Sequence, residues 1–415
     1  NDVLSFTTQY FRSLSRTASL MNQEHPTFLD ETAGTAPNTS NRLIVQVYLG
    51  PRSYEIDIVT DGLASLSGRL ESCKERLSAP GGQVSRKALI VTDGNVAKLY
   101  AHVVRHSLED DGWDCQVHEV EPGEQSKCQA SVSAIYDQLV EFRADRHTVI
   151  AAVGGGVVGD LAGFAAATYA RGIPFIQIPT TLLAQVDSSV GGKVGINHPS
   201  GKNLIGAFHQ PTGVFIDTAT LDSLPGRDYV SGLGEVIKYG ASLDDQFFEY
   251  LEANVEGMRE RASDVLRHVV AHSCRLKADI VEADEEERTG KRAILNYGHT
   301  FAHAFETLCG YGTLLHGEAV SIGMVYAARL AERCGLIDSS VTQRQTGLLE
   351  AVGLPVKLPK ESNISTTDIL DRMKLDKKTV AGQLRFVLPT KLGHAEVFCD
   401  IPEEDVVAVL DELAE

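Results

Sequence analysis

Residues 148–181, TVIAAVGGGVVGDLAGFAAATYARGIPFIQIPTT, contain the pattern that decides the fold. An apolar run leads into a cluster of glycines, an alanine-rich helical segment follows, and a second apolar run begins at residue 174. Two short buried strands joined by a helix are typical of a βαβ unit, whose strands are parallel. This stretch therefore predicts a parallel sheet that is flanked by helices.

The same alternation extends toward the N-terminus. KALIVTD (87–93) and CQVHEVE (115–121) read as strands followed by helical segments, and 43–60 reads as two strands around a Gly-Pro turn. Beyond residue 222 the pattern changes to amphipathic helices, with long runs at 243–282 and 294–335, and then to a late pair of strands. The fold class is thus α/β, followed by a mostly helical region.

These patterns divide the chain into three regions. Residues 1–42 are rich in Ser, Thr and Asn, and we expect a mobile N-terminal extension. Its first twenty residues hold two arginines and one acid, which also resembles a transit peptide. Residues 43–221 should form an α/β domain, and residues 222–415 a mostly α-helical domain.

The composition limits the partners and the compartment. A formal net charge of −18 argues against nucleic acid, whose phosphates would be repelled. No apolar run approaches the roughly 18–20 residues that a membrane helix needs, so no membrane contact is expected. The seven cysteines are scattered without a CxxC pair, which favours reduced thiols and a cytoplasmic location.

The glycine turn GGGVVG (154–159) satisfies G-x-G-x-x-G between a strand and a helix. In that context backbone N–H groups can hold a pyrophosphate. A Rossmann site also needs an acidic residue about 20 positions later, and the next strand ends in QIPTT without one. The turn is therefore either a nucleotide site of another lineage or a packing turn.

A lysine-bearing segment follows. QVDSSVGGKVGINHPSGKN (185–203) is polar and glycine-rich, which predicts a loop. Its chemically active side chains are Asp187, Lys193, Lys202 and Asn203. On the helix beyond it, Glu235 and Lys238 lie three residues apart and share one face.

A polar stripe runs through the segment 292–303. Arg292, Asn296, His299 and His303 recur at i, i+4, i+7 and i+11, which predicts one face of a helix. Their aromatic and aliphatic neighbours favour a buried active-site face over a solvated one.

Three histidines in 298–318 are candidate metal ligands. His299 and His303 have the i, i+4 spacing that can chelate zinc on one helix. His316 follows after a loop, and Glu235 could supply an oxygen ligand. Three protein ligands with an open position are typical of a catalytic zinc. The alternative is that hydrogen bonds satisfy all three imidazoles.

Six stretches carry a resemblance to a known family. They are similar to the sugar phosphate cyclase superfamily, and specifically to the 3-dehydroquinate synthase family, over roughly residues 50–410. Two small departures are Ala302, where a glycine is common, and one extra residue in ADEEERTGKR. The stretches are GGGVVGDLAGFAAATYARG, IPTTLLAQVDSSVGGKVGINHPSGKNLIGAF, GLGEVIKYG, RAILNYGHTFAHAFE, LHGEAVSIGM and DKKTVAGQLRFVLP.

The resemblance implies a role for each candidate residue. A divalent metal, usually zinc and alternatively cobalt, is held by Glu235, His299 and His316, while His303 lies near the substrate. Catalytic residues are Asp187, Lys193, Lys238, Lys277, Arg292, Asn296 and His303. Substrate contacts are Arg171, Lys202, Asn203 and one lysine of DKK, with Lys377 favoured over Lys378. NAD contacts are Gly123, Glu124, Lys127, Gly156, Val157, Val158, Gly159, Asp160, Thr180, Thr181, Lys193, Lys202, Thr220, Leu221, Asp222 and Ser223.

The resemblance also implies a reaction. The expected substrate is the sugar phosphate 3-deoxy-D-arabino-heptulosonate 7-phosphate, and the products are 3-dehydroquinate and phosphate. Transient oxidation by NAD, phosphate elimination, reduction and an aldol closure would make NAD a catalytic cofactor. Arg171 would reach the phosphate of a neighbouring subunit, which implies a homodimer. Other readings are an aminodehydroquinate- or valiolone-type cyclase and a metal-dependent polyol dehydrogenase.

Overall fold

The computed structural model describes residues 41–73, 77, 86–310, 312–359, 364–375 and 384–414. The predicted extension 1–42 lies outside the described residues apart from Asn41 and Arg42, and Arg42 already begins the first strand. Lys377 and Lys378 lie outside them as well.

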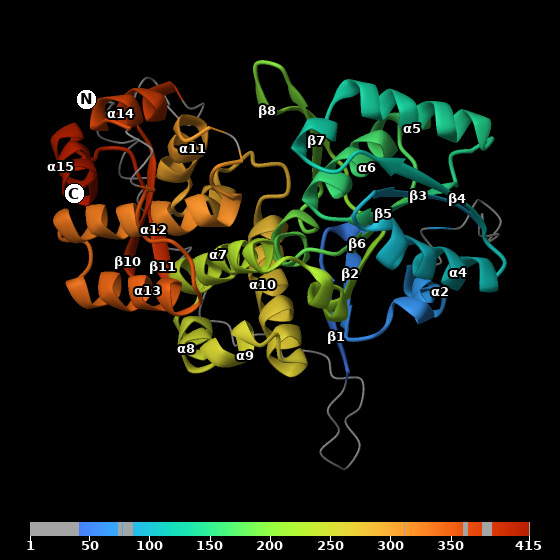
Figure 1. Ribbon diagram of the computed structural model, residues 1–415, viewed down its shortest axis with the longest axis horizontal. Helices are drawn as coiled ribbons and strands as arrows, with labels where there is room; N and C mark the ends of the chain where they lie inside the picture. Colours follow the sequence, from blue (N-terminus) through green and yellow to red (C-terminus); the bar gives the residue numbers. More distant parts are fainter. Residues whose placement is uncertain are drawn as a thin grey trace, which may run out of the picture.

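The predicted α/β architecture is confirmed. A seven-stranded sheet with the order β1-β2-β9-β6-β5-β3-β4 is parallel except for the hairpin β1–β2 (Figure 1). That hairpin is the one predicted at 43–60. The strands are β1 (Arg42–Val47), β2 (Tyr54–Val59), β3 (Lys87–Asp93), β4 (Asp114–Val120), β5 (Val149–Gly154), β6 (Phe175–Pro179) and β9 (Gly213–Asp217).

Helices cover both faces of this sheet because its strands are apolar on both sides. In β3, Ala88 and Ile90 belong to a core cluster with α2 (Leu66–Arg69) and α4 (His102–Asp110). Leu89 and Val91 point the other way, into a cluster with α5 (Gln129–Glu141) and α6 (Gly156–Thr168). Side chains alternate along a strand, so near-continuous apolar runs require two covered faces.

The segment 185–203 is not the loop that its composition predicted. It contains a short π-helix, η7 (Ala184–Ser188), and forms most of a separate hairpin, β7 (Lys193–His198) and β8 (Gly201–Phe208). Gly195 and Gly206 face each other across the hairpin, and a Cβ on Gly195 would lie 2.6 Å from the Ile205 carbonyl oxygen. The glycines here permit a close strand pair instead of marking a loop.

The C-terminal region is helical, as predicted, but its long runs are interrupted. Within 243–282 the Asp244 side chain accepts a hydrogen bond from Phe247 N and caps a new helix. The helices are α7 (Gly226–Leu243), α8 (Asp245–Ala253), α9 (Val255–Arg259), α10 (Ser263–Ala283), α11 (His299–Leu308), α12 (His316–Arg333), α13 (Ser339–Ala351), α14 (Thr366–Leu375) and α15 (Glu403–Ala414). The late strand pair is confirmed as β10 (Phe386–Lys391) and β11 (His394–Phe398).

The two regions share one apolar core. The largest cluster joins side chains of β1, β2 and β9 to side chains of α7, α10, α11 and α12, and Figure 1 shows α10 running between the sheet and the remaining helices. None of the helices in the described part of the chain has the length and apolar character of a membrane span. The predicted division at residues 221 and 222 falls within the 3-10 helix η8 (Thr218–Ser223) and stays a prediction.

The predicted stripe from Arg292 to His303 does not lie on one helix. Arg292 and Asn296 belong to a 3-10 helix, η9 (Lys291–Asn296), while His299 begins α11. Gly298 separates them with a left-handed φ of 78°, and a Cβ there would lie 2.9 Å from Met324 N. The left-handed φ of Gly298 therefore ends the short helix before His299, and the close approach of α12 leaves room only for glycine at this turn.

Candidate active site

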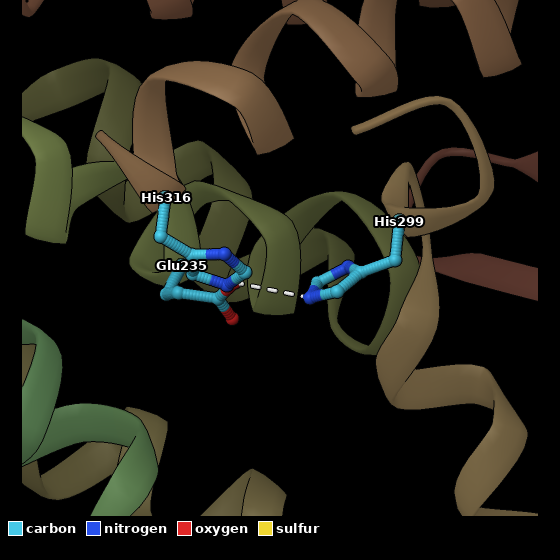
Figure 2. Close-up of side chains that lie close together, drawn as sticks. All are labelled: Glu235, His299 and His316. Atoms are coloured by element: carbon cyan, nitrogen blue, oxygen red, sulfur yellow. Dashed lines mark ion pairs between the residues drawn. The ribbon is translucent and has the colours of Figure 1, made fainter. Parts of the chain in front are cut away.

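Three helices bring the three predicted metal ligands together. Glu235 lies inside α7, and His299 and His316 are the first residues of α11 and α12. The Nε2 atoms of His299 and His316 lie 3.6 Å and 3.4 Å from Glu235 Oε1. Figure 2 shows the two imidazoles approaching this carboxylate from different helices. This trio is the group that could hold a metal ion among the described residues.

The geometry and the burial of this trio suit a divalent cation. Donors bound about 2.0–2.1 Å from one tetrahedral zinc ion lie roughly 3.3–3.4 Å apart, close to the separations found here. Glu235 is fully buried, and neither of its carboxylate oxygens makes a hydrogen bond within the described residues. Lys238 forms an ion pair with Glu235 Oε2. A buried carboxylate with an oxygen free of hydrogen bonds fits a metal ligand better than a structural side chain.

Two glycines allow α12 to approach α7 closely enough for this geometry. A Cβ on Gly317 would lie 1.7 Å from the Ser231 carbonyl oxygen, and one on Gly234 would lie 2.6 Å from the Gly317 carbonyl oxygen. Gly317 N also donates to Ser231 Oγ at 3.1 Å. Any larger residue at either position would push His316 away from Glu235.

A carboxylate and a guanidinium fix the start of α12, where His316 lies. Glu318 accepts a hydrogen bond from Leu315 N at 2.8 Å, as in a capping box. Arg227 of α7 donates two hydrogen bonds to the same carboxylate, from Nε at 2.7 Å and from Nη2 at 2.8 Å. This bidentate pair ties the α12 N-terminus to α7.

Asp187, in η7, lies at the centre of a second cluster of polar and charged side chains. Its Oδ1 accepts hydrogen bonds from Lys277 Nζ at 2.8 Å and from Tyr239 OH at 2.6 Å. Burial would raise the pKa of Asp187, but the charges of Lys277 and Lys238 hold that pKa well below its ordinary value. Burial also lowers the pKa of Lys277, and Asp187 offsets this effect only in part. Asp187 is therefore an ionised acceptor at neutral pH.

The predicted lysines of the hairpin reach the helical region. Lys193 forms an ion pair with Glu287, and Lys202 Nζ lies 3.9 Å from Glu306 Oε1 on α11. Asn203 instead faces the sheet, where its Oδ1 accepts a hydrogen bond from Lys127 Nζ at 2.6 Å. The hairpin thus spans the space between the sheet and the helices that carry the candidate metal ligands.

Arg292 is almost fully buried beside this space. It donates to the Glu285 carbonyl oxygen at 2.7 Å, and its Nε lies 3.7 Å from a Glu287 carboxylate oxygen. Burial lowers the pKa of Arg292, although Glu287 and Asp187 act against that shift. Its Nε makes no hydrogen bond within the described residues. Asn296 and His303 are half-buried nearby in sequence.

The four predicted NAD segments share one edge of the sheet. They follow the carboxyl ends of the parallel strands β4, β5, β6 and β9, the usual place of ligands in such sheets. Thr180 Oγ1 is buried there without a hydrogen bond among the described residues. A hydroxyl in this state can hydrogen-bond a ligand. The segments are 122–127, 156–160, 180–181 and 220–223.

Several residues of these segments also have packing roles. A Cβ on Gly159 would lie 2.9 Å from Gln177 Oε1, so the glycine turn serves helix packing as well. Val158 and Leu221 bury their side chains in the core. The Thr220 hydroxyl is engaged with Asp217 O at 2.7 Å and with the Gln185 amide. Contacts from these three to a nucleotide would have to come from the backbone.

Arg171 stands apart from the other predicted residues. It is exposed in the short 3-10 helix η6 (Tyr169–Arg171), with a left-handed φ of 69°. Its expected action on a neighbouring subunit stays a prediction.

Sequence reasoning overlooked four side chains that support the site. They are Tyr239, which donates a hydrogen bond to Asp187, the Arg227–Glu318 pair, and Glu306, which lies next to His316. Only Glu306 left a signal, because it lies at i+7 from His299 on the same helix face.

Comparisons with known proteins agree with this geometry. Family models described as "3-dehydroquinate synthase N-terminal" and "3-dehydroquinate synthase C-terminal" match residues 117–231 and 232–379. The 3-dehydroquinate synthases of Desulforamulus reducens and Thermodesulfovibrio yellowstonii are 50% and 45% identical over 89% of this chain and 99% of their own. In structure, the 2-epi-5-epi-valiolone synthase of Streptomyces hygroscopicus subsp. jinggangensis, with NAD+ and Zn2+ bound, has a TM-score of 0.77 at 25% identity, covering 92% of this chain and 99% of that one.

The fold and the Glu-His-His group define the class as a sugar phosphate cyclase. The identity to curated relatives then decides between its branches, and the chain belongs to the 3-dehydroquinate synthase family. Its activity is the conversion of 3-deoxy-D-arabino-heptulosonate 7-phosphate to 3-dehydroquinate and phosphate, an NAD- and metal-dependent lyase reaction of the shikimate pathway. The valiolone-type and dehydrogenase readings are therefore set aside.

Proposed function

We propose that the reaction takes place at a zinc ion held by Glu235, His299 and His316. The observation that carries this proposal is the pair of imidazole Nε2 atoms at 3.4 Å and 3.6 Å from one buried carboxylate oxygen. Two imidazoles and one carboxylate are a donor set that zinc accepts in catalytic sites, with a position left open for substrate. Cobalt, the alternative ion, is bound by the same kinds of ligand.

The surrounding cations would bind the anionic groups of the substrate. Lys193 and Lys202 reach the site from the hairpin, and a lysine of the DKK motif is expected to join them at the phosphate. Arg292 offers a buried Nε without a hydrogen bond, and its planar fork suits the substrate carboxylate. Asn296 is a second candidate for that group, since it ends the same short helix.

The chain's own residues position and polarise the sugar. Glu235, His299 and His316 would hold a metal ion that would supply Lewis-acid chemistry at a substrate hydroxyl, and the segments at the strand ends would hold NAD, which would supply hydride transfer. Asp187, kept ionised by Lys277 and Lys238, would accept a hydrogen bond from a substrate hydroxyl. His303 lies on the same helix as His299, with ring centroids 5.5 Å apart, and would contact the substrate instead of the metal.

The remaining assignments concern NAD, the oligomeric state and the location. The NAD roles of the four sheet-edge segments are supported by their shared position at the strand ends. The homodimer, with Arg171 acting across it, and the cytoplasmic location remain predictions from the sequence.

Substitution of a ligand tests this proposal. His316→Ala should lose bound zinc and the release of phosphate from the heptulosonate phosphate together, because no other described side chain replaces that imidazole. His106→Ala is the matched control, since that side chain is 77% exposed on α4 at the sheet. A His316→Ala protein that keeps one tightly bound zinc per chain would exclude this ligand set.

A further inference from the structure

Glu306 lies against the far side of the metal ligand His316. Its Oε2 is 3.6 Å from His316 Nδ1, while Nε2 of the same ring faces Glu235 at 3.4 Å. The Glu306 side chain is only 14% exposed. The imidazole is therefore bracketed by two carboxylates, one on the side of the metal site and one behind it.

The other histidine of the site has an equivalent arrangement. His299 Nδ1 lies 3.1 Å from the Tyr297 carbonyl oxygen, and its Nε2 faces Glu235 at 3.6 Å. A neutral imidazole carries one N–H and one free lone pair. An oxygen acceptor at Nδ1 selects the tautomer whose lone pair is on Nε2. Both rings thus present Nε2 to the same point for the same reason.

We propose that Glu306 is the positioning residue that holds His316 in its metal-binding tautomer and orientation. The inference rests on the zinc site proposed above. The separation of 3.6 Å needs to shorten by roughly 0.6 Å to reach ordinary hydrogen-bond length, a change within reach of one side-chain rotation. A carboxylate, unlike the carbonyl behind His299, also adds negative charge and raises the basicity of the ring.

The place of Glu306 in the fold supports a dedicated role. It lies on α11 at i+7 from His299, so one helix carries a ligand and the group that orients the ligand of the next helix. Its second oxygen lies 3.9 Å from Lys202 of β8. This largely buried carboxylate therefore lies among His316, Lys202 and His303, and it has little contact with water.

Zinc affinity of the full chain is the direct test. We expect Glu306→Ala to raise the zinc dissociation constant by about 10–100-fold, the usual effect of removing such a partner. Glu306→Gln should lie in between, because its amide oxygen can still accept from Nδ1–H but carries no charge. Competition with a chromophoric chelator at fixed pH measures both. Glu350→Gln, an exposed residue of α13, is the control and should match the wild type.

A second measurement distinguishes a positioning role of Glu306 from a general loss of folding stability. With cobalt in place of zinc, Glu306→Gln should change the visible absorption of the bound ion, since that absorption depends on ligand geometry, while the melting temperature of the metal-free protein stays unchanged. Wild-type zinc affinity and an unaltered cobalt spectrum in both Glu306 variants would overturn the inference. If His316→Ala also kept its zinc, the failure would instead lie with the proposed ligand set.

Discussion

Replacing Gly317 by alanine should pull the proposed metal ligands apart without removing any of them. Gly317 follows His316 in α12, and a Cβ there would lie 1.7 Å from the Ser231 carbonyl oxygen of α7. Real Cβ atoms essentially never come within 3.0 Å of such an atom. The two helices must therefore separate by about 1.3 Å or more, because neither backbone can yield locally.

The size of the effect follows from this displacement. Overpacking of a tight helix contact costs about 1–3 kcal/mol, and alanine returns up to about 1 kcal/mol through its higher helix propensity. We therefore expect a stability loss of up to about 3 kcal/mol in the metal-free protein. Metal–donor distances tolerate only about 0.2 Å, so zinc affinity should fall by at least about 100-fold.

A matched glycine provides the control. Gly347 lies inside α13, where an added Cβ would have no atom within 4 Å. Gly347→Ala should leave zinc affinity unchanged and keep or slightly raise the melting temperature. Both variants are compared by thermal melting without metal and by chelator competition for zinc. Wild-type zinc affinity in Gly317→Ala would refute the argument that this close contact sets the metal site.

Three further predictions concern the chemistry. With substrate and trace NAD, the enzyme should turn over many times without net NADH absorbance, because the hydride is returned. Arg292→Lys should cost roughly 2–5 kcal/mol of transition-state stabilisation with the heptulosonate phosphate, measured as a loss of kcat/KM. The loss with sedoheptulose 7-phosphate, which has no carboxylate, should be far smaller. Because the pKa of Asp187 is depressed in the fold, its contribution to stability is present above the ordinary pKa of about 3.9 and is lost as the pH falls below it. Asp187→Asn should thus lose less stability between neutral pH and about pH 3 than the wild type does.

Each of these predictions has a contradicting outcome. Stoichiometric NADH accumulation would indicate a dehydrogenase. Equal losses on both sugars would make Arg292 structural instead of a carboxylate contact. If urea unfolding gave Asp187→Asn and the wild type the same loss of unfolding free energy between neutral pH and about pH 3, Lys277 and Lys238 would not hold that carboxyl in its ionised form.

Local sequence patterns predicted much of the fold because the hydrophobic pattern of a helix or a strand repeats within a few residues. The alternation of apolar runs and helical segments predicted the parallel sheet, and the near-continuous apolar strand 149–154 implied two covered faces. The same reasoning failed at 185–203, where glycines that suggest a loop instead allow two strands to pair closely. Composition does not distinguish these two uses of glycine.

The candidate site shows a similar division. Residue types and family motifs were enough to name Glu235, His299 and His316, and the structure brings these three together. Spacing alone favoured His299 with His303, because helical periodicity describes neighbours on one helix. Glu306 was overlooked although it lies at i+7 from His299, and Tyr239 was overlooked because nothing in its local sequence distinguishes it from a packing residue.

The sequence by itself thus determined the α/β class, the helical second half and the chemical types at the site, because hydrophobic period and motif are properties of local sequence. Only the tertiary structure decided how those types meet. It placed the break at Gly298, which has a left-handed φ and lies too close to Met324 to carry a Cβ. It also brought α12 against α7 at Gly317, so that imidazoles from two helices face one carboxylate on a third. Such approaches depend on excluded volume between segments far apart in the chain, which no local period encodes.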